Sequence, residues 1–204
     1  MSDTKQHWEQ VFSTKLPEEV SWTQAVPLTS LALIHLTGVS KSAPIIDVGG
    51  GDSKLVDNLL AEGYTDITVL DISVEALKRA KARLGNDAAN VQWIESDIKD
   101  FKPTRKYAVW HDRAAFHFLT ETADIEQYAE TLGEFASPHL IIATFSETGP
   151  EKCSALPVTR YAEQDMVNVF GKHFNLIDSF TENHITPFNT LQNFRFNIFA
   201  HKLA

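Results

Sequence analysis

The chain has 204 residues, of which 43% are hydrophobic and 22% charged; this size and composition indicate one globular domain and exclude a disordered chain. The formal net charge of −9 excludes a broad basic surface for nucleic acid, and no apolar run is long enough to cross a membrane. Because Cys153 is the only cysteine and the first residues do not resemble a secretory signal, we expect no disulfide and a cytoplasmic location.

Residues 1–40 are expected to be mostly helical. Pro17 and Pro27 should divide them into short pieces, because proline breaks the hydrogen bonding of a helix interior. Residues 44–204 change character and alternate between short apolar runs and amphipathic segments. No repeat or long linker separates the two parts, so we expect residues 1–204 to form a single domain.

The alternation begins at Ile45–Val48, a β-branched run that ends in three glycines and predicts a buried strand. Further strands of this kind are predicted at 67–70, 91–94, 107–110 and 140–145. Between them, apolar residues at helical spacing predict helices, two of which should end at Gly63 and Gly85. This order predicts an α/β fold with a doubly wound, Rossmann-like parallel sheet and helices on both faces.

The last part of the chain departs from the alternation. A helix around Met166–Phe170 is followed by two long strand-like segments, Phe174–Ile185 and Gln192–His201. The turn between them, 186–189, is too short for a crossover helix. We therefore expect an antiparallel hairpin on one edge of the sheet.

A glycine-rich turn follows the first strand, at the sheet edge where α/β proteins bind their ligands. Asp47 stands two residues before this turn, Gly49–Gly51, whose glycines let a ligand approach the backbone. A dinucleotide site would have a further glycine in place of Lys54, and no P-loop occurs in the chain. Asp47 and Asp52 suit a ligand with a cationic part. The alternative is a turn that merely connects a strand to a helix.

Two more acids follow the next two strands. Asp71 stands where Rossmann-like sites place an acid for ribose hydroxyls, although it could instead cap the following helix. Asp97 follows the third strand, where a carboxylate can reach the amino edge of an adenine and Ile98 can pack near the ring. Alone, Asp97 is a common loop acid. The register that it shares with Asp47 and Asp71 favours a nucleoside-binding site.

Together these residues resemble the class I S-adenosylmethionine-dependent methyltransferases, whose seven-stranded sheet also ends in an antiparallel hairpin. The resemblance implies that the cofactor is bound by Asp47, Gly49, Gly50, Gly51, Asp71, Ile72, Asp97, Ile98 and His111. It also implies an N-terminal lid over residues 1–40, with Trp8 and Trp22 in it, and a Rossmann-like core over 44–204. The chain departs from the family pattern at Ser53, where a third glycine is frequent, and at 137–139, where Pro-Gly-Gly often precedes the fifth strand.

The segment after the fourth strand should face the methyl acceptor in this family. Its ionisable side chains are His111, Asp112, Arg113 and His117. We expect Asp112 and His117 to take part in acid–base catalysis. The alternative is that Asp112 forms a structural ion pair with Arg113 while His117 packs against its neighbours. No histidines have the paired spacing of a metal site, so we expect no metal.

The acceptor is expected to be a small amine, thiol, hydroxyl or carboxylate, held by Arg113, Trp22 and Tyr161. The N/D-P-P-Y/F motif of nucleic-acid amino-methyltransferases is absent, and we expect neither nucleic acid nor membrane as a partner. Alternatives are a protein-lysine methyltransferase, a NAD(P)-dependent oxidoreductase and a cofactor-binding module without turnover. Cys153, in the loop 147–160, is either a small apolar residue or a reactive thiol. The sequence sets no oligomeric state.

Overall fold

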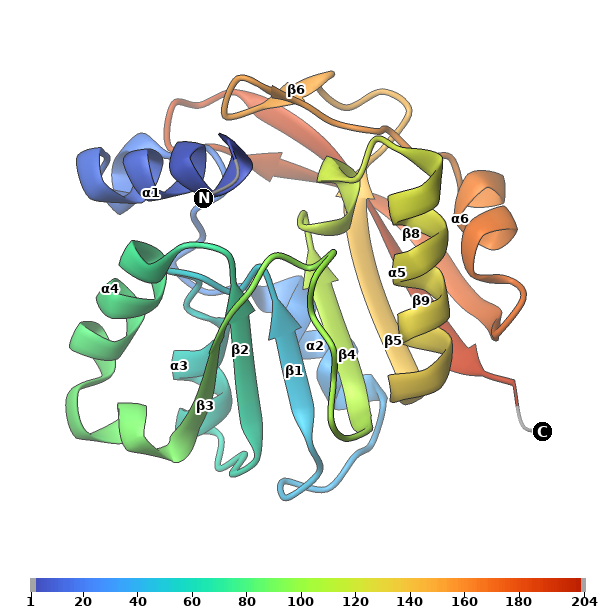
Figure 1. Ribbon diagram of the computed structural model, residues 1–204, viewed down its shortest axis with the longest axis horizontal. Coiled ribbons are helices and arrows are strands. Elements are labelled where there is room, and N and C mark those ends of the chain that lie inside the picture. The colour runs from blue at the N-terminus through green and yellow to red at the C-terminus, as the bar shows by residue number, and fades with distance from the viewer. Residues whose placement is uncertain (1–2, 203–204) are drawn as a thin grey trace.

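A computed structural model describes residues 3–202 and contains one seven-stranded sheet in the order β3-β2-β1-β4-β5-β9-β8 (Figure 1). Its strands are β1 (Ile45–Val48), β2 (Ile67–Asp71), β3 (Val91–Glu95), β4 (Tyr107–Arg113), β5 (Ala136–Phe145), β8 (Phe174–Ile185) and β9 (Leu191–His201). Strands β1 to β5 are parallel, and β9 pairs antiparallel with both β5 and β8. The predicted α/β fold and the C-terminal hairpin are therefore confirmed.

Helices cover both faces of this sheet. They are α1 (Asp3–Thr14), α2 (Leu28–Leu36), α3 (Leu55–Ala61), α4 (Val74–Leu84), α5 (Thr122–Phe135) and α6 (Glu163–Phe170), with short 3-10 turns η1 (Pro17–Glu19), η2 (Gly85–Asn90) and η3 (Phe116–Phe118). Figure 1 shows α5 in front of the sheet and α2 and α3 behind it. Among residues 3–202, no helix has the length and apolar character needed to span a bilayer.

The two faces of the sheet bury two separate hydrophobic clusters. Ile45 packs into the cluster beneath α2, α3 and α4, and the next residue, Ile46, packs into the cluster beneath α5 and α6. Neither side chain is exposed. This two-sided burial is why the parallel strands are continuous apolar runs rather than alternating ones.

Strand β4 is longer than its apolar run predicted. The prediction ended the strand at Trp110, but pairing with β1 and β5 continues, and His111 lies opposite both Asp47 and Ile141. Hydrogen bonding on both sides therefore holds polar residues in the sheet. The segment expected to be a loop begins only after Arg113.

The first helix, α1, lies over the carboxyl ends of the strands, whereas α2 packs on a face of the sheet. The predicted breaks are confirmed, since η1 begins at Pro17 and α2 begins directly after Pro27. Helix α1 packs against α4 and, in Figure 1, lies above α4 and the tip of β2 rather than on a face of the sheet. The loop after β5 forms a further small hairpin, β6 (Lys152–Cys153) with β7 (Leu156–Pro157), which the sequence did not predict. Helix α1 and the β6–β7 hairpin both contribute residues to the wall of the site.

Candidate functional site

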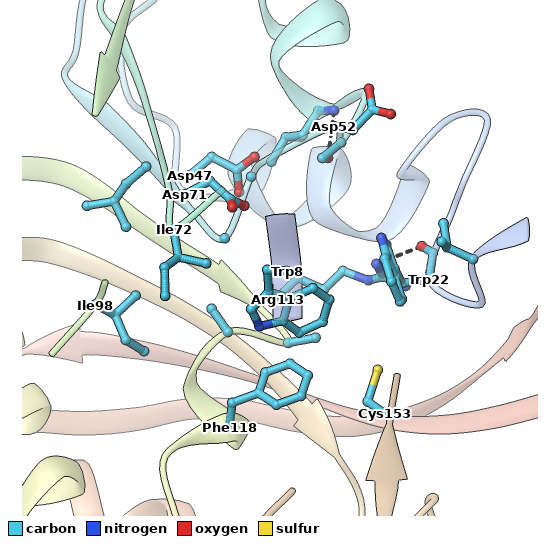
Figure 2. Close-up of a pocket in the computed structure, with 18 of the residues that line it drawn as sticks. Trp8, Trp22, Asp47, Asp52, Asp71, Ile72, Ile98, Arg113, Phe118 and Cys153 are labelled. Carbon is cyan, nitrogen blue, oxygen red and sulfur yellow. Dashed lines mark hydrogen bonds between the residues drawn. The ribbon is translucent and has the colours of Figure 1, made fainter. Parts of the chain in front are cut away.

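A cavity of about 490 Å³ lies at the carboxyl ends of the parallel strands, beneath α1 (Figure 2). Its volume is in the range of small-molecule sites. Ten of the residues expected at the site line it: Trp22, Asp47, Gly49, Gly50, Asp71, Ile72, Asp97, Ile98, His111 and Arg113. Four others do not reach its wall: Gly51, Asp112, His117 and Tyr161.

The turn Gly49–Gly51 has no room for side chains. A Cβ on Gly49, whose φ is +69°, would lie 2.8 Å from the Cβ of Ala115. A Cβ on Gly50 would lie 2.6 Å from the Asp47 Oδ2. Contacts this close are not tolerated, so the absence of side chains is what allows the turn to pack against the Asp47 carboxylate and leaves backbone open toward the cavity.

Asp47 is held by a buried chain of hydrogen bonds. Its Oδ1 lies 2.7 Å from the His111 Nδ1, and the His111 Nε2 lies 2.9 Å from the Ser30 Oγ. All three side chains are buried, and within residues 3–202 the Asp47 Oδ2 has no hydrogen-bond partner. That orphaned oxygen is suited to a ligand ammonium group. Ser30, on α2, belongs to no motif, and no pattern in the chain pointed to it.

Asp71 is buried at the end of β2 and is only 6% exposed. Burial, with smaller contributions from the charges of Asp47 and Glu9, raises the pKa of Asp71 to about 7. Its Oδ1 accepts a hydrogen bond from the Ser73 backbone N–H at 2.8 Å. The cap of α4 is Ser73, whose hydroxyl accepts the Ala76 N–H, so capping does not require Asp71.

The sides of the cavity next to Asp71 come from two loops. Ile72 follows β2, and Asp97 and Ile98 follow β3; all three side chains are half-buried and line the cavity. The Asp97 Oδ1 accepts the Lys99 N–H at 3.1 Å, which fixes its carboxylate. Apolar side chains beside a fixed acid suit a flat base with an exocyclic amino group.

Glu9, on α1, does not line the cavity but holds its cover in place, a role that the sequence did not predict. Its carboxylate accepts the Ser73 hydroxyl at 2.9 Å and the backbone N–H groups of Val74 and Glu75 at 2.8 and 3.1 Å. Burial alone would raise the pKa of Glu9, but these hydrogen bonds outweigh it and hold the pKa below its ordinary value. A negative charge at the N-terminus of α4 is favourable, so Glu9 fastens α1 over the cavity.

An aromatic cluster completes the cover. The Trp8 ring on α1 meets the rings of Trp22 and Phe118 edge-on, with centroids 5.7 and 5.2 Å apart. Phe12 packs against both Trp8 and Trp22. These apolar rings therefore cover part of the outer side of the cavity.

Strand alternation separates the ionisable residues of β4. His111 and Arg113 face the cavity, whereas Asp112 faces α5 and accepts the Tyr128 hydroxyl at 2.7 Å and the backbone N–H groups of Ala115 and Phe116. Burial raises the pKa of Asp112 to about 6, although these hydrogen bonds oppose it. The alternative of an Asp112–Arg113 ion pair is wrong, because Asp112 has these partners instead. Its contacts favour a structural role over the catalytic one.

His117 is also enclosed. Its Nδ1 accepts the Phe145 backbone N–H at 3.2 Å, and its ring packs between Phe118 and Phe145. Burial, together with the nearby charge of Arg113, lowers the pKa of His117 to about 3. A histidine with this pKa is a poor general base near neutral pH, and the contacts of His117 favour a structural role.

Replacing Asp112 with asparagine should lower the free energy of unfolding by about 1–3 kcal/mol. The reason is that an amide cannot accept all the hydrogen bonds that converge on the two carboxylate oxygens. Urea denaturation measures the loss, with the exposed Asp178→Asn as a control that should change little. A stable Asp112→Asn protein with reduced turnover would instead restore a catalytic role.

The remaining acceptor candidates lie at different depths. The Arg113 Nη1 donates a hydrogen bond to the Trp22 carbonyl at 3.2 Å, at the cavity wall. Tyr161 stacks on Phe116 behind that wall, with ring centroids 5.1 Å apart. Cys153 lines the cavity, and burial raises the pKa of its thiol to about 11, which favours the apolar interpretation over a reactive thiolate. Within residues 3–202, no cluster of three metal-ligating side chains occurs.

A seven-stranded sheet of this order, with a glycine turn and three acids at its carboxyl edge, defines the class I methyltransferase fold. Residues 45–138 match the family model of a methyltransferase domain. A malonyl-[acyl-carrier protein] O-methyltransferase of Ilyobacter polytropus is 23% identical over 171 residues, which cover 79% of this chain and 63% of that protein. The chain thus spans less than two thirds of that relative's length.

Solved structures share the fold at low sequence identity. One structure, from a study of the conversion of a disulfide bond into a thioacetal group in echinomycin biosynthesis, has a TM-score of 0.76 at 16% identity. The superposition covers 97% of this chain and 93% of that one. The N-methyltransferase NodS of Bradyrhizobium japonicum, in complex with S-adenosylhomocysteine, has a TM-score of 0.74 at 12% identity. The superposition covers 99% of this chain and 100% of NodS. The chain therefore has the class I methyltransferase fold, and its residues 45–138 match a methyltransferase domain, in agreement with the predicted family.

Proposed function

We propose that this chain transfers the methyl group of S-adenosylmethionine to a small-molecule acceptor and releases S-adenosylhomocysteine. The observation that carries the proposal is the gathering of Asp47, Asp71 and Asp97 on one cavity beside an open glycine turn. These residues come from three separate strand ends, in the order in which the family uses them. The match of residues 45–138 to a methyltransferase domain supports the same reaction.

The residues fit this cofactor. The orphaned Asp47 Oδ2 and the backbone of Gly49 and Gly50 suit a methionine portion with its ammonium group. Asp71 would accept ribose hydroxyls, and Asp97 would accept the adenine amino group. Ile72, Ile98 and His111 complete the proposed cofactor set. Each proposed polar contact pairs a buried or half-buried acid with a donor group of the ligand.

When bound, S-adenosylmethionine supplies a methyl group that its positively charged sulfur already activates. The chain therefore has chiefly to align the acceptor and to exclude water. His111 and Ser30 hold Asp47 in place, while Glu9 and Trp8 keep α1 closed over the cavity. Both His111 nitrogens are engaged, and neither Asp112 nor His117 reaches the cavity wall. This arrangement favours an acceptor whose lone pair is available without a protein base.

A small acceptor is favoured over a protein lysine because the cavity lies beneath α1 and its aromatic cluster. The relative from Ilyobacter polytropus is named for methylating a malonyl group, which is also small. The oxidoreductase alternative lacks support, since Lys54 replaces the glycine that a dinucleotide turn needs.

Ligand-dependent melting and methyl transfer together test the proposal. S-adenosylhomocysteine should raise the melting temperature, whereas NADPH should not, because a ligand that binds the native state stabilises it by mass action. Methyl-labelled S-adenosylmethionine should then pass its label to a component of a small-molecule extract. Stabilisation by NADPH instead would overturn the cofactor, and stabilisation by S-adenosylhomocysteine without any labelled product would indicate a binding module.

Cofactor affinity should depend on pH through Asp71. Since its pKa is raised to about 7, the ligand-free carboxyl is protonated at lower pH, and ribose hydroxyls bind the ionised form better. The dissociation constant of S-adenosylhomocysteine should be constant above about pH 7 and rise by up to about tenfold per pH unit below it. Calorimetry at a series of pH values measures this. The control, Asp71→Asn, should bind weakly and without this pH dependence; a flat profile in the unmodified protein would contradict the prediction.

A further inference from the structure

We infer that the methyl acceptor carries a carboxylate, which the guanidinium group of Arg113 binds inside the cavity. The inference rests on the proposed function, because it names the acceptor class of the same site. The arginines that line the cavity differ in whether they have an acidic partner. Arg83 and Arg79 both lie within ion-pair distance of Asp52, whereas Arg113 has no such acidic partner among residues 3–202.

The hydrogen bonds of Arg113 leave one edge of its guanidinium group free. Nη1 donates to the Trp22 carbonyl, but Nε and Nη2 are buried and have no hydrogen-bond partner among the residues that the structure describes. Nε and Nη2 lie on the same edge of the planar group and present two parallel N–H donors. A carboxylate has two oxygens at the spacing that this edge binds side-on. A buried cation without such a partner is unfavourable, and an anionic ligand would remove the cost.

The groups packed nearest to this edge are neutral. The Phe194 ring lies 4.8 Å from the Arg113 Cζ, and the neighbouring Cys153 and His117 are both neutral at pH 7, with pKa values of about 11 and about 3. Burial lowers the pKa of Arg113 itself to about 10, so it stays charged. The site is therefore a positive charge between apolar walls, which suits an acid with an apolar remainder.

The two acidic side chains whose charges act on Arg113, Asp47 and Glu182, make no ion pair with it in the described part of the chain, and each has one oxygen bonded to another residue. Asp47 bonds to His111, and Glu182 accepts the Thr29 hydroxyl. His184 also lies on this side and donates a hydrogen bond to the Ser21 carbonyl, and burial keeps its pKa below the ordinary value. No nearby side chain thus supplies the missing carboxylate.

Arg113 lies on the acceptor side of the cavity. Figure 2 shows Ile72 and Ile98 on one side of the view and Trp22 and Cys153 on the other, with Arg113 extending toward Trp22. The cavity is thereby divided into a part suited to the adenine and a part suited to a second ligand. Since the cofactor also carries a carboxylate, the experiment must measure the two ligands separately.

The test is calorimetry on protein saturated with S-adenosylhomocysteine, titrated with acetate, hexanoate and phenylacetate and with the matched neutral amides. At least one acid should bind about tenfold or more tightly than its amide. Arg113→Met should abolish this difference, and Arg113→Lys should retain part of it because the charge remains without the two-donor edge. Arg105→Gln is the matched control, since Arg105 pairs with Asp66 and does not line the cavity.

Melting curves show whether each variant folds, and Arg113→Lys serves as the test if Arg113→Met does not. Acids that bind no better than their amides, while S-adenosylhomocysteine still binds, would overturn this inference alone. A loss of S-adenosylhomocysteine affinity of about tenfold or more in Arg113→Met would assign Arg113 to the cofactor carboxylate and also overturn it. Failure of the unmodified protein to bind S-adenosylhomocysteine would instead overturn the proposed function.

Discussion

Replacing Asp71 with alanine should weaken the binding of S-adenosylhomocysteine by about ten- to a hundredfold, the equivalent of about 1.5–3 kcal/mol for a charged acceptor. The expected size follows from the position of the carboxylate, which is buried at the end of β2 and lines the cavity. In the proposed complex the carboxylate accepts hydrogen bonds from the ribose hydroxyls, and water would be a weaker acceptor at this buried position. Loss of the side chain leaves those hydroxyls unpaired.

The fold should survive this change, because the ionised Asp71 is itself costly to bury. Its pKa is raised from 3.8 to about 7, so its contribution to the free energy of unfolding falls as the pH rises through that range. At pH 8, ligand-free Asp71→Ala should therefore be as stable as the unmodified protein or more stable.

Calorimetry and thermal unfolding measure the two quantities, and Asp87→Ala, at an exposed position, is the matched control. An unchanged affinity in Asp71→Ala would show that Asp71 only shapes the turn that precedes α4.

Replacing Gly50 with alanine should reduce the affinity for S-adenosylhomocysteine by about a hundredfold or more and destabilise the chain by about 1–3 kcal/mol. The new Cβ would lie 2.6 Å from the Asp47 Oδ2 and 2.9 Å from the Val69 Cγ1. Neither neighbour can yield easily, since His111 holds Asp47 and Val69 is buried in β2. The turn itself must therefore move into the space proposed for the cofactor.

Gly63→Ala is the control for this variant. Gly63 has a φ of +86°, but a Cβ added there would have no neighbour within 4 Å, so alanine introduces backbone strain without a clash. It should lower stability without lowering cofactor affinity, as calorimetry and urea denaturation would show. If Gly50→Ala bound S-adenosylhomocysteine as tightly as the unmodified protein, the turn would not be the cofactor site.

The sheet could be predicted because its signal is local. Short β-branched runs and the spacing of apolar residues indicate strands and helices without knowledge of their neighbours. The end of β4 could not be predicted this way, since His111, Asp112 and Arg113 resemble a loop until β1 and β5 are known to pair with them. Once the strand is extended, alternation places Asp112 on the opposite face from the other two. That extension accounts for the difference between the expected and observed surroundings of Asp112.

The contacts that enclose the site could not be predicted for a different reason. Glu9 reaches Ser73 across 64 residues of chain, and Ser30 reaches His111 across 81. Neither residue belongs to a spacing pattern, and each acts only through the tertiary packing of its helix. By contrast, Asp47, Asp71 and Asp97 could be proposed because each lies at or just beyond the end of a predicted strand.

Trp8 and Trp22, which contact each other edge-on, make intrinsic tryptophan fluorescence a probe of the cavity. Of the four tryptophans in the chain, these two line the cavity, while Trp110 is fully enclosed in the core and Trp93 packs against Lys81. Emission from Trp8 and Trp22 should respond to a ligand beside the indoles, and the other two should contribute a constant background. Rapid-mixing fluorescence on unlabelled protein can therefore time the arrival of a ligand, and single Trp8→Phe and Trp22→Phe variants would separate the contributions of the two indoles.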